Sequence, residues 1–251
     1  MRMSVCILAM AAAAAVMPGG AQAAEIKVLT AGAFKQVLLA LLLDFEKQSG
    51  HTVRVENDTV GAVSKRIEAG EIFDLAVLTP GAIDKLAGKF VPGSRMNLAR
   101  VGIGVVVKEG SPKPDISSVA AFKQALLTAN SIAYIDPAAG GSSGIYVAGL
   151  LDRLGIAGQV KGKSKLIAGG AVAEHIAKGE AELGIHQISE ILPVKGVTLV
   201  GPLPADIQSY TTYAGAIGAN VRAGEAAKEL LRTLASPAAA SVLRAKGMEP
   251  A

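Results

Sequence analysis

The chain has 251 residues, and 25 lysines and arginines against 21 acidic residues give it a net charge of +4. This weak, scattered basic charge, with only five Phe, four Tyr and no Trp, excludes a nucleic-acid-binding protein and favours a small anionic ligand. The single cysteine, Cys6, lies in the apolar start of the chain, so the remainder offers no disulfide, thiolate nucleophile or thiolate metal site.

Residues 1–23 have the pattern of a secretory signal peptide. Arg2 precedes an apolar run over residues 5–17, and Ala21-Gln22-Ala23 forms a small-x-small cleavage site. The apolar run is too short to span a bilayer. We therefore expect cleavage near Ala23 and a periplasmic location.

Short apolar runs then alternate with helical patterns in two cycles. The first cycle predicts strands at 26–29, 53–56 and 75–78 and helices at 33–47, 61–69 and 83–87. The second predicts strands at 101–108, 132–135, 183–187, 197–200 and 210–217 and helices at 119–129, 142–154, 171–178, 223–234 and 237–246. This alternation predicts an α/β protein with mostly parallel sheets and helices on both faces.

Two cycles in one chain suggest two lobes. The strand at 101–108 is where the chain would cross to the second lobe, and the strand at 210–217 is where it would return. We expect residues 24–100 and 214–251 to form lobe I, residues 101–213 to form lobe II, and the ligand cleft to lie between them.

Small residues occupy the turns between the strands and the helices that follow them, at 29–33, 57–61, 78–81, 136–144 and 168–170. Ligands of open α/β sheets bind at this edge, where the free N–H groups and dipoles of helix N-termini favour anions. Backbone or hydroxyl donors are expected from Ala33, Thr59, Gly61, Thr79, Ser142, Ser143 and Gly169. Lys35 lies in a first helical turn, where a cation is unfavourable unless an anion binds beside it.

Each turn taken singly is also typical of ordinary loops and caps. Asp58 and Thr59 are good caps for the helix at 61–69, and Lys35 is equally compatible with a solvated surface position. The stretch 140–144, Gly-Gly-Ser-Ser-Gly, is the most unusual and favours a functional role.

No strong catalytic signature is present. The chain lacks a Gly-x-Ser-x-Gly elbow, a His-Glu-x-x-His pair and a phosphate loop ending in Gly-Lys-Ser/Thr. Of its histidines, His51 is expected to be solvated and His175 exposed. His186 and Gln187 end a strand near the ligand edge, where a buried structural histidine is the commoner outcome and a ligand contact is the alternative. Three scattered histidines predict no metal site, and no cofactor is expected.

At these turns the sequence resembles the periplasmic molybdate-binding proteins of ABC importers, which have the type II periplasmic-binding fold. The resemblance runs along nearly all of residues 24–251. It is carried by Val28-Leu29-Thr30-Ala31-Gly32-Ala33, Ile67-Glu68-Ala69-Gly70 with Asp74-Leu75, Asp136-Pro137 with Gly144-Ile145-Tyr146, and Gly179-Glu180-Ala181-Glu182-Leu183-Gly184-Ile185.

The sequence departs from that family where its hydroxyl donors are expected. Ala33 stands at the serine of the first turn, Thr59-Val60-Gly61 replaces a serine run, and His186-Gln187 occupies the stretch that usually supplies a tyrosine. The backbone donors near Ser143 and Gly169 carry over. Charged and amide donors such as Lys35 and Gln187 suit a polycarboxylate better than a tetrahedral oxyanion.

The resemblance leaves three functions open. The first is a receptor, expected to be a monomer, that delivers a small anion to a membrane ABC permease. The second is a periplasmic aconitate isomerase, since similar sequences include such enzymes; His186 would then move the proton, with Lys35 as an electrostatic clamp and Asp58 as a possible base. The third is a ligand sensor that uses the same cleft.

Overall fold

The computed structural model describes residues 23–170 and 172–251. The strands in these residues are β1 (Glu25–Ala31), β2 (Thr52–Asp58), β3 (Leu75–Leu78), β4 (Met96–Lys108), β5 (Ile132–Ile135), β6 (Ser164–Ile167), β7 (Leu183–Gln187), β8 (Val197–Pro202), β9 (Tyr210–Ile217) and β10 (Glu249–Pro250). The α-helices are α1 (Gly32–Ser49), α2 (Val60–Glu68), α3 (Pro80–Lys85), α4 (Val119–Thr128), α5 (Ser142–Arg153), α6 (Ala157–Val160), α7 (Val172–Ala177), α8 (Ile188–Ile191), α9 (Gly224–Leu234) and α10 (Ala239–Ala245). Short 3₁₀ turns are present at Ala87–Lys89, Pro137–Ala139, Lys161–Lys163 and Ala205–Ile207.

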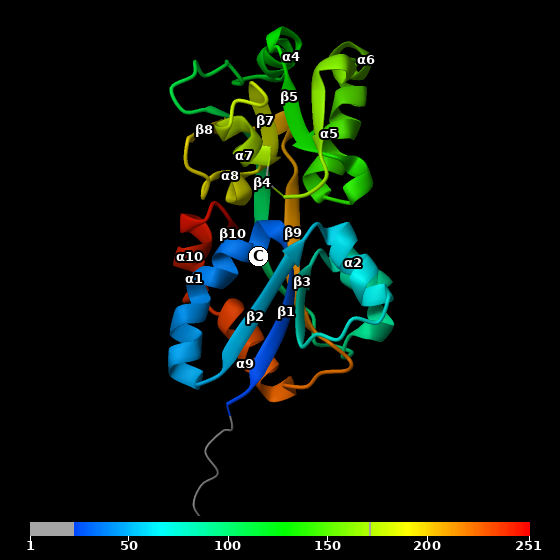
Figure 1. The fold of residues 1–251 in the computed structure, drawn as a ribbon, viewed down its shortest axis with the longest axis vertical. Coiled ribbons are helices and arrows are strands. Elements are labelled where there is room, and N and C mark those ends of the chain that lie inside the picture. Colours follow the sequence, from blue (N-terminus) through cyan, green and yellow to red (C-terminus); the bar gives the residue numbers. More distant parts are fainter. Residues whose placement is uncertain (1–22, 171) are drawn as a thin grey trace, which may run out of the picture.

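The elements gather into two groups stacked along the long axis of the molecule (Figure 1). The lower group contains β1, β2 and β3 with α1, α2, α9 and α10, and the upper group contains β5, β7 and β8 with α4 to α8. Within each group the pairs β1–β2, β1–β3, β5–β6 and β5–β7 are parallel, as expected for strand-helix-strand units.

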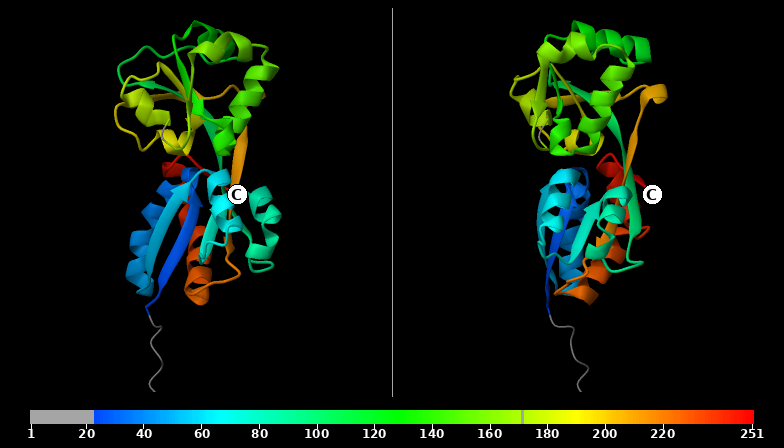
Figure 2. Two further views of the ribbon diagram at one scale, coloured as in Figure 1. Left: turned by 45° about the vertical axis from the view of Figure 1, so that its right-hand side comes forward. Right: turned by 90° about the vertical axis from the view of Figure 1, so that its right-hand side faces the viewer.

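Strands β4 and β9 run from one group into the other and pair with each other in antiparallel fashion (Figure 2). Residues of β4 up to Gly102 pair with β9, whereas those from Ile103 onward pair with β7. The sheet as a whole is therefore mixed, with the parallel pairs outside and antiparallel pairs at the two crossing strands. The lobe boundaries expected at 100/101 and 213/214 fall inside these two strands.

Each group buries apolar side chains on both faces of its strands. In the lower group one cluster lies under α1 and α9, around Phe34 and Leu230, and another lies under α2 and α3, around Ile67. In the upper group Phe122 belongs to the cluster under α4 and α5, and Ile176 to the cluster under α7. The expected α/β fold with helices on both faces is confirmed.

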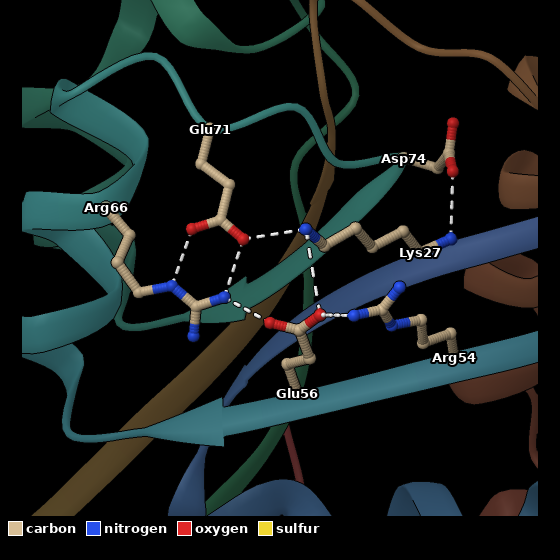
Figure 3. Close-up of polar contacts among 6 residues, drawn as sticks. All are labelled: Lys27, Arg54, Glu56, Arg66, Glu71 and Asp74. Atoms are coloured by element: carbon tan, nitrogen blue, oxygen red, sulfur yellow. Dashed lines mark hydrogen bonds and ion pairs between the residues drawn. The ribbon is translucent and has the colours of Figure 1, made fainter.

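An ionic network ties β1, β2 and α2 together on the lower group (Figure 3). Arg66 binds Glu71 through two nitrogens, with both N···O distances 2.6 Å, and also contacts Glu56. Lys27 Nζ lies 2.7 Å from Glu71 and 3.7 Å from Glu56. Glu56 and Glu71 therefore each face at least two cations.

The environment of His51 differs from the expectation. His51 was expected to be solvated, but its side chain is only 7% exposed; its Nδ1 accepts from the Ala24 N–H at 3.2 Å, and its ring lies near Phe45. That expectation was wrong because the His51 ring is covered by Phe45 of α1, Ala24 just before β1 and Glu229 of α9. The expected signal peptide falls almost entirely outside the described residues. Among the described residues no helix combines the length and the apolarity needed to cross a bilayer.

Candidate functional site

A cavity of about 410 Å³ lies where the two groups of elements meet. Its walls come from the ends of β1, β2, β5 and β7, from the first residues of α1 and α5, and from α8 and β9. The lining residues are Ala31, Gly32, Ala33, Lys35, Gln36, Asn57, Asp58, Thr59, Val60, Ile135, Gly141, Ser142, Ser143, Gly169, Gly170, Glu174, His186, Gln187, Glu190, Pro193, Val194 and Tyr213.

Two helix N-termini open into this cavity. The residues before α1 and α5 are Ala31 and Gly141, and neither provides a capping side chain. The first N–H groups of a helix have no intrahelical acceptor, and the helix dipole is positive at that end. Because α1 belongs to the lower group and α5 to the upper group, an anion between them would be bound from both sides.

His186 and Glu190 form a buried pair in the wall of the cavity. His186 Nε2 lies 3.4 Å from Glu190 Oε2, and the side chains are only 2% and 13% exposed. His186 Nδ1 has no hydrogen-bond partner among the described residues. Burial lowers the pKa of His186 to about 4 and raises the pKa of Glu190 to about 8. At neutral pH the imidazole is therefore neutral and the carboxyl group carries a proton.

Tyr213 and Gln187 form a second polar pair in the same wall. Tyr213 Oη donates to Gln187 Oε1 at 3.2 Å, and Gln187 Nε2 donates to Thr211 Oγ1 at 3.3 Å. Burial, with a smaller contribution from Glu190, raises the pKa of the Tyr213 phenol above its ordinary value. Both ends of the Gln187 amide already have protein partners, and one of its N–H groups remains for a ligand.

The two groups also touch directly beside the cavity. Thr59 Oγ1 donates to Ala139 O at 2.5 Å, and the Gly61 N–H donates to Gly140 O at 3.1 Å. A Cβ on Gly61 would come within 2.8 Å of Gly140 Cα, so the contact needs glycine there. The Thr59 hydroxyl also accepts from the Ala62 N–H and caps α2, as expected for that residue.

The structure brings most of the expected site residues into this cavity. Its wall includes Ala33, Lys35, Asp58, Thr59, Ser142, Ser143, Gly169, His186 and Gln187. Gly61 and Thr79 are not part of the wall: Gly61 makes the contact with Gly140, and Thr79 caps α3 by accepting from the Ala82 N–H. Asp58 is exposed at the cavity rim, where its Oδ1 accepts from the Thr59 N–H at 2.7 Å.

Two glycines of the stretch 140–144 are required by the backbone structure. Gly140 has a positive φ of 72°, and a Cβ on Gly144 would lie 2.2 Å from Ile135 O. Glycine at 144 therefore lets α5 pack directly on β5. The two serines between these glycines line the cavity together with Gly141.

Glu190 and Tyr213 were missed by the sequence analysis. Glu190 is the one acidic residue of the segment 183–194, and it follows His186 by four positions. That isolated charge was the available signal. Tyr213 gave none, because a tyrosine in an apolar strand is typical of an ordinary core residue.

The donors of this cavity do not resemble a metal site. In residues 23–170 and 172–251 no three His, Cys, Asp or Glu side chains gather closely enough to ligate a metal. The arrangement suits an organic or inorganic anion bound by N–H and cationic donors, beside a pair of groups able to exchange a proton.

Comparison with known proteins places the chain in a family. The family model described as bacterial extracellular solute-binding protein matches residues 26–249. The chain belongs to this family. The expected kinship with periplasmic molybdate-binding proteins and aconitate isomerases is confirmed by two relatives of this solute-binding protein.

The first relative is an aconitate isomerase from Pseudomonas sp., 34% identical over 233 residues, which cover 90% of this chain and 87% of the relative. The second is the molybdate-binding protein ModA of Azotobacter vinelandii, 29% identical over 258 aligned positions and 98% of both chains.

Solved structures support the fold. The Azotobacter vinelandii periplasmic molybdate-binding protein superimposes with a TM-score of 0.71 at 24% identity, covering 89% of this chain and 98% of that one. The sulfate-binding protein SubI of Mycobacterium tuberculosis H37Rv gives a TM-score of 0.69 at 18% identity, with coverages of 90% and 87%.

Proposed function

We propose that this solute-binding protein works in the periplasm, binds an unsaturated tricarboxylate in the cavity between its two lobes, and interconverts the cis and trans forms of aconitate. The supporting observation is the buried imidazole of His186, which lies in a cavity that two uncapped helix N-termini and Lys35 make attractive to carboxylates. A receptor that only holds an anion has no need of a proton-accepting group there.

Binding would use the donors of both lobes. The first N–H groups of α1 and α5 each suit one carboxylate, with the hydroxyls of Ser142 and Ser143 as additional donors. Lys35 would bind a further carboxylate, and its Nζ forms no ion pair with an acidic side chain in the described part of the chain. Contacts from both lobes favour closure around the ligand.

Interconversion requires an allylic proton shift. A proton leaves the methylene carbon of aconitate, the C–H electron pair becomes the new double bond, and the old double bond moves its electrons to the carbon that receives a proton. His186 is the better base, because it is buried in the cavity wall and neutral at pH 7. Asp58 is less suited, because it is exposed and already accepts the Thr59 N–H.

The relative from Pseudomonas sp. that bears the name aconitate isomerase supports this proposal, because its 34% identity extends over nine-tenths of this chain. The same fold also hosts transport receptors, so fold alone does not choose between turnover and transport.

A second candidate is a receptor that delivers a tetrahedral oxyanion to an ABC permease without changing it. The observation that favours it is the 29% identity to ModA over 98% of both chains. The uncapped α1 and α5 N-termini would serve such an anion as well.

The test is direct conversion. The protein purified from the periplasm of an expressing bacterium is incubated with cis-aconitate at pH 7, and trans-aconitate is followed by proton NMR. We expect conversion with wild type and its loss in His186→Ala, with Asp58→Asn keeping most of the rate. Binding of trans-aconitate without conversion would leave a polycarboxylate receptor, and binding of molybdate alone would favour the second candidate.

A further inference from the structure

Glu190 lies in the wall of the proposed site, beside His186 and the start of α1. Its Oε2 lies 3.4 Å from His186 Nε2, and its other oxygen, Oε1, reaches the first residue of α1. A Cβ on Gly32 would lie only 2.6 Å from that Oε1, and a Cβ on Gly170 would lie 3.9 Å from it. The carboxyl group therefore sits between the helix end of one lobe and the loop of the other.

The position of Glu190 is unusual for a structural acid. No hydrogen bond to its side chain is present in the described residues beyond the contact with His186, and no lysine or arginine of the described residues forms an ion pair with it. A structural carboxylate of this depth is normally bound by several donors, as Asp74 is by the N–H groups of Lys27, Arg222 and Ala223.

We infer that Glu190 is the second proton-transfer group of this site, and that it delivers a proton to one carbon of the substrate while His186 removes a proton from another. This inference rests on the proposed isomerisation and names a catalytic residue for it. The two groups stand side by side in the wall of one cavity, so an allyl system bound alongside the pair could meet a base at one end and an acid at the other.

The proton balance closes within the pair. His186 Nε2 takes the proton from the substrate methylene as that C–H bond breaks, and the far carbon forms a C–H bond with the proton of the Glu190 carboxyl group. The imidazolium and the carboxylate then stand in contact. Transfer of a proton from Nε2 to Oε2 returns both groups to their starting state, and no oxidant, reductant or further reactant is needed.

The first test is Glu190→Gln, assayed in deuterium oxide. Without an acid, the proton removed by His186 can only return to the carbon it left, so exchange continues while isomerisation stops. We expect the isomerisation rate to fall at least about 100-fold, and the ratio of deuterium incorporation to isomerisation to rise at least tenfold. Glu225→Gln, which removes an exposed carboxylate on α9, is the control and should match wild type.

The second test leaves Glu190 in place and moves it. Gly32→Ala puts a methyl group 2.6 Å from Oε1, too close for the two atoms to coexist, and the flexible carboxyl end can shift away while the backbone of α1 stays helical. We expect a loss of isomerisation in the same direction as for Glu190→Gln. Gly81→Ala, whose added Cβ meets nothing within 4 Å, is the matched control.

The outcomes separate the two proposals. A folded Glu190→Gln variant, with its melting transition intact, that isomerises within about threefold of wild type at an unchanged exchange ratio would overturn the role of Glu190 and leave the isomerase intact. A wild-type protein that binds trans-aconitate but neither exchanges nor converts it would overturn the proposed function, and this inference with it.

Discussion

Two clusters of charged residues in this molecule treat their carboxylates in opposite ways. In the network of Figure 3, Glu71 faces Arg66 and Lys27, and these partners lower its pKa to about 2. In the cavity, Glu190 faces a neutral imidazole in a buried wall, and burial raises its pKa to about 8. The two acids differ in their surroundings and not in their chemistry.

The difference separates stability from function. A carboxylate with cations on several sides fixes neighbouring elements, here β1, β2 and α2, and has no proton to give at neutral pH. A buried carboxyl group without such partners costs stability when it ionises, and it keeps a proton that it can transfer. A buried carboxyl group of this kind is typical of a functional site.

The two lysines extend this comparison and give the largest expected effect. Lys27 is paired with Glu71 and Glu56, whereas Lys35 lines the cavity. We expect Lys35→Met to weaken trans-aconitate binding by about 1.5–3 kcal/mol, the range for a charged hydrogen bond, as measured by calorimetry. Lys27→Met should leave the affinity unchanged; equal affinity in wild type and Lys35→Met would place Lys35 outside the site.

Glu190→Gln should stabilise the free protein at alkaline pH. The folded pKa of Glu190 lies above its unfolded value, so the wild type loses stability as pH rises from about 4.5 to about 8. Glutamine does not ionise, and the unfolding free energy of the variant should therefore exceed that of wild type by at least about 2 kcal/mol at pH 8.5, with little difference at pH 4.5.

Urea titrations at the two pH values measure this effect. The charged or titratable neighbours in the cavity wall, His186, Lys35, Tyr213, Asp58 and Glu174, are common to both proteins, so their own titration largely cancels in the difference. A gap between the proteins that is the same at both pH values would contradict the raised pKa of Glu190.

Glu71→Gln should act with the opposite sign. The folded pKa of Glu71 is lowered, so its contribution is present above about pH 4.5 and is lost as pH falls towards about 2. We expect the substitution to cost about 1 kcal/mol of unfolding free energy at pH 7, and less at pH 3. Chemical denaturation measures this cost. An unchanged unfolding free energy at pH 7 would mean that the ion pairs of Arg66 and Lys27 with Glu56 are sufficient without Glu71.

The smallest expected effect is the response to salt, which should differ between the exposed network and the buried pair. The network is partly exposed, and 1 M NaCl screens such pairs, so the cost of Glu71→Gln should shrink by a few tenths of a kcal/mol. The buried pair should respond much less. Thermal melts of both variants with and without salt test this, and a stronger salt response of Glu190→Gln would show that the pair is open to solvent.

Much of the fold could be predicted from the sequence because buried strands leave an unbroken apolar signal. The expected bounds of β3, β5, β7 and β9 coincide with the structure. Strand β6 was missed, since it is an edge strand whose Lys165 and Leu166 are exposed and give no pattern. Helix α8 has only four residues, too few for any helical period.

The site residues that could be predicted are those placed by a strand and the helix that follows it in the sequence. Ser142 and Ser143 begin α5 after the turn that follows β5, and Gly169 lies just beyond β6, so the edge of the sheet places them together. Glu190 enters through the pairing of β4 with β7 and the packing of α8 against α1, which are long-range features. Tyr213 enters because β9 runs from one group of elements into the other beside β4. Neither arrangement can be derived from neighbouring residues in the sequence.

The most direct test of the account is a calorimetric comparison of trans-aconitate and molybdate on the same wild-type protein at pH 7. The account predicts binding of trans-aconitate, followed by a slow heat or NMR signal of conversion to the cis form, and much weaker binding of molybdate. Tight binding of molybdate with no response to trans-aconitate would contradict it, and would show that the helix N-termini alone, without Lys35, His186 and Glu190, set the ligand of this cavity.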